Sequence, residues 1–214
     1  MLNSQQMAAV KYIDGPLLVL AGAGSGKTRV ITQKIGYLIN SCGYNANSIC
    51  AVTFTNKAAN EMRARVSAFL PAVSRRGLKV ATFHTLGLSI IKRDVSRCDL
   101  KPGFSIFDSE DCLQILRGFL PVNKATDRDF ILKVQQQISL WKNNLLNPEL
   151  ILQNPPETLL CDEALTIYPR YQEALKAYNA VDFDDLIRLP VNLLNDHADV
   201  LEYWQNKIRH LLVD

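Results

Sequence analysis

The sequence lacks any segment that could cross a membrane or direct export. No apolar run in its 214 residues approaches the roughly 20 residues that a membrane-spanning helix needs. The N-terminus also lacks the basic stretch followed by an apolar stretch that marks a secretory signal. We therefore expect a cytoplasmic protein with no membrane partner.

Cysteine is scarce, and its spacing is irregular. The number of cysteines is odd, and no two of them form a Cys-x-x-Cys pair, which argues against a disulfide framework and against a zinc ribbon. We expect reduced thiols, most of them packed in the interior. The five residues are Cys42, Cys50, Cys98, Cys112 and Cys161.

Charge of one sign is not in large excess. The net charge of +3 neither requires nor excludes a nucleic-acid partner, because the clustering of charges matters more than their sum. One basic cluster is opposed only by Glu61, and taken alone it is best interpreted as a solvated helix face. Its members are Lys57, Arg63, Arg65, Arg75, Arg76 and Lys79.

Apolar residues, in contrast, make up 48% of the chain, which is enough for a globular protein with a buried core. Three short apolar runs, at residues 17–21, 49–54 and 78–83, favour strands. The first two are followed by segments with helical periodicity, and the third by a shorter helical stretch. This alternation predicts an α/β fold in which helices cover a parallel sheet.

A different pattern occupies residues 88–181, where helical stripes occur without a convincing strand. Asp108 and Ser109 favour the N-cap of the first of these helices. The longest stripe covers residues 130–145. In a later stripe, Pro169 is expected to kink or split the helix, because proline removes a backbone donor.

After this helical region the chain is expected to return to the sheet. A helical segment broken near Pro190 and a helix over residues 198–207 precede an apolar strand over residues 208–214. The predicted organisation is an α/β domain interrupted by an all-helical insertion.

A glycine-rich segment follows the first apolar run and opens the first helix after it. It reads Ala21-Gly22-Ala23-Gly24-Ser25-Gly26-Lys27-Thr28, the spacing of a phosphate-binding loop with alanine at the first position. Small residues let backbone N–H groups surround a phosphate. Lys27 can reach the terminal phosphates, and the hydroxyl of Thr28 can bind Mg²⁺. A glycine-rich turn could match the same pattern, but the flanking strand and helix favour nucleotide binding.

The ends of the next two predicted strands resemble each other, as Thr53-Phe54-Thr55-Asn56 and Thr82-Phe83-His84-Thr85. Ligands of open α/β sheets gather at the carboxyl ends of the strands. Rings that stack on bases, beside polar groups that meet phosphates, suit single-stranded nucleic acid. Packing of both rings in the core is the alternative, and these residues alone leave it open.

Acidic residues stand at two informative places. Asp214 ends the last apolar run, where P-loop proteins carry a carboxylate that holds Mg²⁺. Asp182, Asp184 and Asp185 could suggest a metal site, but they lie where a helix begins, and we interpret them as structural. Trp141 lies on an apolar stripe and is interpreted as core rather than as a DNA contact.

Together, these motifs resemble the N-terminal half of the Rep/UvrD group of superfamily-one DNA helicases, over essentially the whole chain. Only the phosphate-binding segment would be shared with unrelated P-loop proteins. The segments that carry the resemblance are LLVLAGAGSGKT (17–28), AVTFTNKAANEM (51–62), TFHTLG (82–87), DFDDLI (182–187) and WQNKIRHLLVD (204–214).

The resemblance implies ATP and Mg²⁺ as cofactors. Gln6 then belongs to a motif whose glutamine recognises adenine, which an amide can do through two hydrogen bonds. The phosphate-binding loop would hold the phosphates, and Lys27, Thr28 and Asp214 would serve catalysis, the last two through the metal. The residues implied to bind DNA are Phe54, Thr55, Asn56, Thr82, Phe83 and His84.

The resemblance also implies a RecA-like motor domain formed by residues 1–87 and 184–214, around a helical insertion at 88–183. The implied activity is ATP-dependent 3′–5′ translocation on single-stranded DNA, with unwinding of duplexes in replication or repair. Single-stranded DNA and its junctions with duplex are the implied partners, and replication or repair proteins and a second copy of the chain are candidates. The catalytic glutamate, the arginine finger and the second motor domain are expected beyond Asp214, so the chain alone is not expected to unwind DNA.

Two other functions remain open at this stage. One is the helicase portion of a recombination helicase–nuclease, which shares these motifs. The other is a nucleotide-operated switch that binds protein partners and is indifferent to DNA.

Overall fold

The computed structural model describes residues 2–156 and 159–214. Within them, the chain divides into two compact units. The first comprises residues 2–86 and 198–214, and the second comprises Gly87–His197. In the described part of the chain, no helix combines the length and the apolar character needed to cross a membrane.

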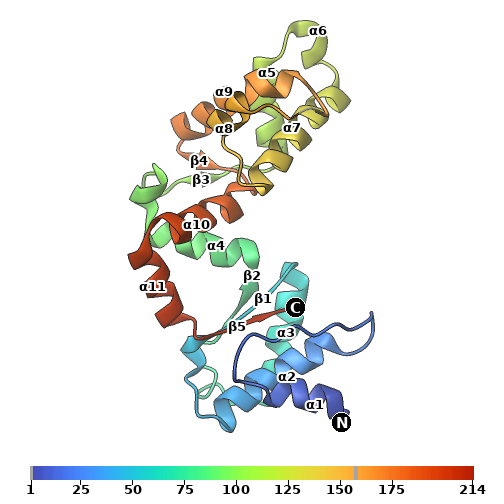
Figure 1. Cartoon of the computed structure of the whole chain (residues 1–214), viewed down its shortest axis with the longest axis vertical. Coiled ribbons are helices and arrows are strands. Elements are labelled where there is room, and N and C mark those ends of the chain that lie inside the picture. The colour runs from blue at the N-terminus through green and yellow to red at the C-terminus, as the bar shows by residue number, and fades with distance from the viewer. Residues whose placement is uncertain (1, 157–158) are drawn as a thin grey trace. The chain divides into compact units, whose positions relative to one another are not determined.

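A three-stranded parallel sheet forms the centre of the first unit (Figure 1). Its order is β2 (Lys79–Thr82), β1 (Ile49–Thr53), β5 (His210–Val213). The central strand β1 is buried along its whole length because it has a neighbour on each edge. The strands predicted over residues 49–54, 78–83 and 208–214 are therefore confirmed.

The register of this sheet brings three strand ends together. Thr53 pairs with Thr82, and Val52 pairs with Val213. In parallel strands the carboxyl ends share one edge of the sheet. The residues that follow the three strands therefore emerge at this same edge.

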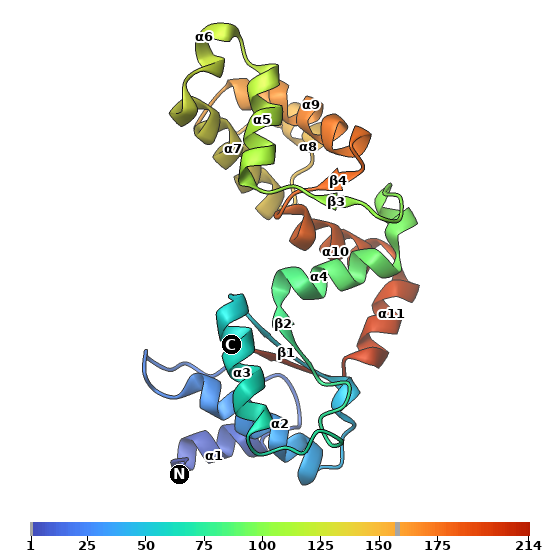
Figure 2. The same ribbon diagram turned by 180° about the vertical axis from the view of Figure 1, so that it is seen from behind.

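Helices α2 (Lys27–Asn40) and α3 (Asn56–Ser67) pack against the sheet. Together they help to bury a core cluster of the first unit, whose members are Ile35, Leu38, Ile49, Ala51, Ala59, Met62, Val66, Leu70 and Val80. A short helix, α1 (Ser4–Lys11), lies beside α2 in both views of the molecule (Figures 1 and 2). The 3₁₀ turn η1 (Ala46–Ser48) precedes β1, and α11 (Ala198–Lys207) precedes β5.

The prediction of a strand at residues 17–21 is wrong. This segment forms no ladder, and Leu18 and Leu20 are 82% and 87% exposed. An apolar run favours burial in a sheet, but a strand forms only where its backbone groups meet those of a neighbour. No strand in the described residues pairs with this segment.

The second unit is mainly helical. A core cluster in this unit includes Leu116, Ile131, Trp141 and Tyr168, so Trp141 is a core residue as expected. The helix α4 (Phe83–Arg93) begins in the first unit and continues into the second. The other elements are η2 (Val95–Cys98), α5 (Ser109–Phe119), α6 (Val122–Ala125), α7 (Arg128–Asn143), α8 (Pro148–Gln153), α9 (Glu163–Ala177) and α10 (Asp185–Asp196).

This unit also contains a strand pair, which the sequence did not predict. β3 (Ser105–Ile106) and β4 (Ala180–Val181) pair in parallel. Two residues are too few to show the alternation by which a strand is recognised in a sequence.

In this region the predicted helix start at Asp108 is confirmed, whereas two predicted helix breaks are not observed. Asp108 is the N-cap of α5 and forms a capping box with Asp111, as its position predicted. Neither a split at Pro169 nor a break near Pro190 occurs, because α9 and α10 run through these prolines. Each proline removes one backbone hydrogen bond, and burial of the flanking turns, such as Tyr168 beside Pro169, outweighs that loss.

Candidate nucleotide and nucleic-acid site

The glycine-rich loop leads directly into α2. Gly26 precedes the helix with φ of 85°, and Gly24 has φ of 75°. Side chains other than glycine rarely adopt this left-handed conformation, so these two glycines fix the path of the loop. Lys27 is therefore the first residue of the helix, where free backbone N–H groups and the helix dipole favour an anion.

The side chain of Lys27 folds back over the loop. Its Nζ donates to the carbonyl oxygens of Ala21, at 3.1 Å, and Gly22, at 2.9 Å. The ammonium charge thus lies on the same loop whose backbone suits phosphate oxygens. The contact between Lys27 and the phosphates of a nucleotide stays a prediction.

Thr28 meets the acid at the end of β5. Its Oγ1 donates to Asp214, with oxygen–oxygen distances of 2.9 and 3.1 Å to the two carboxylate oxygens. The backbone N–H of Asp214 donates to Val52 at 3.0 Å, which continues the β1–β5 pairing by one residue. A hydroxyl beside a carboxylate is an oxygen set that Mg²⁺ accepts.

Gln6 reaches the same loop from α1. The helix begins with a capping box, in which Asn3 accepts from the backbone of Gln6 and Oε1 of Gln6 accepts from the backbone of Asn3. Nε2 of Gln6 donates to the carbonyl oxygen of Ser25 at 2.9 Å. The residue predicted to recognise adenine therefore contacts the loop predicted to hold the phosphates.

The two predicted DNA-binding corners lie at the same edge of the sheet as Asp214. Phe54 is 80% exposed and Phe83 is 38% exposed, so neither residue is sealed in the core. Thr55 caps α3 by accepting from the backbone of Ala58 at 3.1 Å. Asn56 follows as the first residue of α3, and its side chain is exposed.

Thr82 and His84 are less accessible than these rings. Thr82 is buried, and its hydroxyl is bonded to Thr85 through both the backbone N–H and the hydroxyl of that residue. His84 is half-buried on the first turn of α4. Of the six residues predicted to bind DNA, Thr82 therefore shapes the corner rather than presenting a free group.

Two basic residues make contacts that the sequence did not predict. Arg63 donates to the carbonyl oxygen of Val80 in β2 at 2.8 Å, so one member of the basic cluster ties α3 to the sheet. Lys34 on α2 donates to the carbonyl oxygens of Ala9 and Tyr12 at the end of α1. Bonds from a side chain to distant backbone carbonyls leave no spacing pattern in a sequence.

The acidic group in the second unit is structural, as interpreted. Lys142 is fully buried, and its Nζ lies 2.6 Å from Asp182 and 3.0 Å from Asp185. Arg188 pairs with Asp185 at 2.9 Å, and the hydroxyl of Tyr171 donates to Asp182 at 2.9 Å. Among the described residues, no group of histidine, cysteine and acidic side chains is arranged to hold a metal ion.

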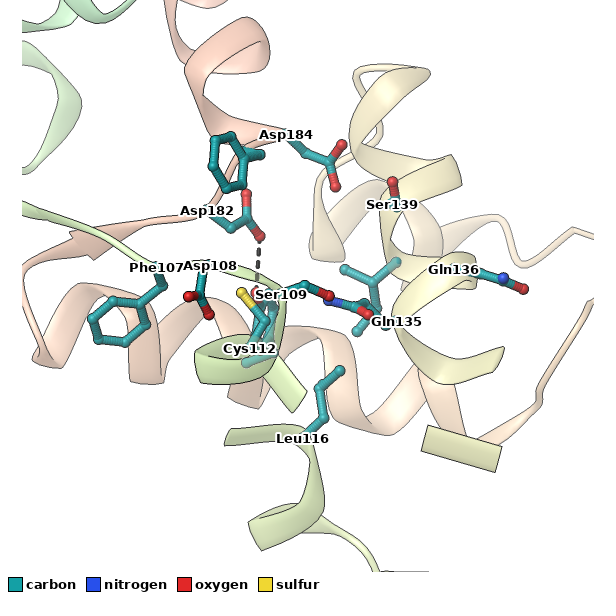
Figure 3. Close-up of a pocket in the computed structure, with 13 residues that line it drawn as sticks. Phe107, Asp108, Ser109, Cys112, Leu116, Gln135, Gln136, Ser139, Asp182 and Asp184 are labelled. Atoms are coloured by element: carbon teal, nitrogen blue, oxygen red, sulfur yellow. Dashed lines mark hydrogen bonds between the residues drawn. The ribbon is translucent and has the colours of Figure 1, made fainter. Parts of the chain in front are cut away.

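A cavity of about 260 Å³ adjoins this ion network (Figure 3). Asp108 and Ser109 at the start of α5, Gln135 and Ser139 on α7, and Asp184 before α10 face it. Asp108 accepts hydrogen bonds from backbone N–H groups at the start of α5, and Asp184 accepts one from the side chain of Asn143. The acids at this cavity therefore serve local structure.

The loop at the start of α2, with Asp214 beside it at the edge of a parallel sheet, defines the class of P-loop nucleotide-binding proteins. The family profile described as UvrD/REP helicase N-terminal domain matches residues 2–214, and the chain belongs to this family. The chain is 48% identical over its whole length to the ATP-dependent DNA helicase Rep of Escherichia coli (strain K12), covering 32% of that protein. It is 38% identical to the ATP-dependent DNA helicase PcrA of Staphylococcus epidermidis (strain ATCC 12228 / FDA PCI 1200), covering 29% of it. The chain thus spans about a third of the length of these relatives.

Proposed function

We propose that the chain is the ATP-binding part of a DNA helicase that moves 3′ to 5′ along single-stranded DNA and unwinds duplexes. The observation that carries this proposal is the placement of Lys27, Thr28 and Asp214 at one site, beside exposed rings at the same edge of the sheet. Family membership and the names of the relatives, which are ATP-dependent DNA helicases, support it.

The loop would bind the phosphates of ATP through its backbone N–H groups and the charge of Lys27. Thr28 and Asp214 would hold Mg²⁺, which neutralises phosphate charge when bound. Gln6 would recognise the adenine base. Each of these side chains already contacts the loop or its partner in the described structure, which supports their assignment to one site.

The DNA track would run over the carboxyl edge of the sheet. Phe54 and Phe83 would stack on bases, while Thr55, Asn56 and His84 would contact the sugar–phosphate backbone, and Thr82 would hold the second corner in shape. We assign residues 1–87 and 184–214 to the motor domain and residues 88–183 to its helical insertion.

ATP hydrolysis by the full-length protein, measured with and without single-stranded DNA, tests this function. We expect strong stimulation by DNA and loss of activity in Lys27→Ala. A protein that hydrolyses ATP at the same rate in both conditions would instead be a nucleotide switch. The helicase–nuclease alternative predicts DNA cleavage, which the same samples reveal on a gel.

A further inference from the structure

Contacts with α2 and the loop before it position α1, the helix that carries Gln6. This helix has eight residues, and Val10 is its only buried side chain. Isolated helices shorter than about 12 residues are marginal in water, so α1 depends on contacts with the rest of the unit. Those contacts decide where the amide of Gln6 lies.

Lys34 closes the C-terminal end of α1. Its Nζ donates to the carbonyl oxygen of Ala9 at 3.0 Å and to that of Tyr12, the C-cap residue. The last carbonyl groups of a helix have no partner within the helix, and a cation there also favours the helix dipole. The bond to Ala9 is partly buried, which limits competition from water.

The helix that supplies Lys34 is α2, which begins with Lys27 and Thr28. The opposite end of α1 is tied to the same structure, because Gln6 donates to Ser25 in the loop before α2. The short helix is therefore held at both ends by a single element, the loop and helix that would bind the phosphates. Figures 1 and 2 both show α1 lying along α2.

We propose that Lys34 is a positioning residue for nucleotide recognition, which sets the distance between the adenine-reading amide of Gln6 and the phosphate-binding loop. The inference rests on the proposed function, since it deepens ATP binding at that site. Lys34 touches neither base nor phosphate, and acts by fixing the helix that carries Gln6. Loss of its bonds weakens recognition of adenine while phosphate binding by the loop persists.

The test compares ATP with UTP, which carries the same phosphates but lacks adenine. In the full-length protein with saturating single-stranded DNA, Lys34→Met keeps the length of the side chain and removes its donors. We expect the ratio of kcat/KM for ATP to that for UTP to fall roughly tenfold or more, because Lys34→Met removes two charge-assisted hydrogen bonds. The loss lies in KM for ATP, with kcat retained. Lys34→Arg, which keeps donors at this position, restores the ratio.

Two controls separate positioning from general damage. Lys11→Met removes an exposed lysine from the last turn of α1 and leaves the ratio unchanged. In a Gln6→Ala background, Lys34→Met causes no further loss of the ratio. Lys34 acts only by positioning the amide of Gln6, which this background already lacks. A ratio unaffected by Lys34→Met, an equal loss for ATP and UTP, or additive losses in the double variant would each overturn the inference. A wild-type protein that hydrolyses ATP without preferring it to UTP overturns base recognition by Gln6 before any variant is made.

Discussion

The hydroxyl of Thr28 lies 2.9 Å from a carboxylate oxygen of Asp214, although 186 positions separate the two residues in the chain. The helical unit Gly87–His197 lies between them in sequence. The contact forms because β5 pairs with β1 in a register that delivers Asp214 to the start of α2. If these oxygens hold Mg²⁺, neither residue alone is sufficient for binding the metal ion.

This geometry predicts how ATP binding depends on magnesium. Asp214→Asn and Thr28→Val should each raise the Mg²⁺ concentration needed for half-maximal ATP binding by roughly tenfold or more, since each removes an oxygen ligand or its charge. Titration of the full-length protein with Mg²⁺ at fixed ATP measures this. Gln33→Ala, which removes a polar side chain at an exposed position on the same helix, is the control and should bind as wild type. Unchanged magnesium dependence in both site variants would contradict the assignment.

The exposed ring of Phe54 predicts a loss of DNA affinity without a loss of stability. Phe54→Ala should weaken binding of single-stranded DNA by about 1–3 kcal/mol, the usual contribution of one base stacked on an aromatic ring. The thermal midpoint should stay the same, because the ring is 80% exposed. Fluorescence anisotropy of a labelled oligonucleotide measures the affinity. Val73→Ala, which also removes an exposed apolar side chain, should bind DNA normally.

The buried ion network predicts that removing one charge from it strongly lowers the stability of the protein. Lys142→Met leaves Asp182 and Asp185 buried without their ammonium partner, and should destabilise the protein by about 3–5 kcal/mol. Lys133→Met removes an exposed lysine from the same helix and should change stability little. Thermal unfolding of the two variants gives the comparison. Equal midpoints would show that the network is dispensable.

A pH effect is predicted at Glu163. Its hydrogen bond with Lys124, followed by that with Cys161, lowers the pKa of the carboxyl to about 2. A folded-state pKa below the unfolded value means that this carboxylate stabilises the fold above about pH 4.5 and loses that contribution as pH falls toward 2. The contribution stays below about 1 kcal/mol because the pair is partly exposed.

A carboxyl-detected NMR titration measures the pKa of Glu163 directly. In Lys124→Met it should move up toward the ordinary value near 4.5. If Glu163 titrates near 4.5 in the wild-type protein as well, the pairing with Lys124 does not form in solution.

Sequence patterns predicted those parts of the fold that depend on local chemistry. The runs at residues 49–54, 78–83 and 208–214 became strands, and Asp108 became an N-cap, because the pattern and the tertiary partner agree. The run at residues 17–21 carries the same signal, but a sequence does not say whether a strand has a neighbour to pair with. Pro190 shows the opposite case. The sequence predicts a helix break at this proline, but α10 continues through it because its residues are buried against the rest of the unit.

The candidate site was predictable to a similar extent. The loop residues and Asp214 follow from motif spacing, and the sheet register explains why they meet. The contact of Gln6 with Ser25, the two bonds of Lys34 and the inward bond of Arg63 all end on backbone carbonyls. Every residue has such a carbonyl, so no residue type marks these contacts in the sequence.

The central claim is that one edge of the sheet serves both the nucleotide and DNA. ATPase measurements on the full-length protein, over a titration of single-stranded DNA, test it most directly in wild type and Phe54→Ala. We predict DNA-stimulated hydrolysis in both, with a higher DNA concentration needed for half-maximal stimulation in the variant and the same KM for ATP without DNA. Hydrolysis that ignores DNA in the wild type, or identical titration curves for the two proteins, would contradict the claim.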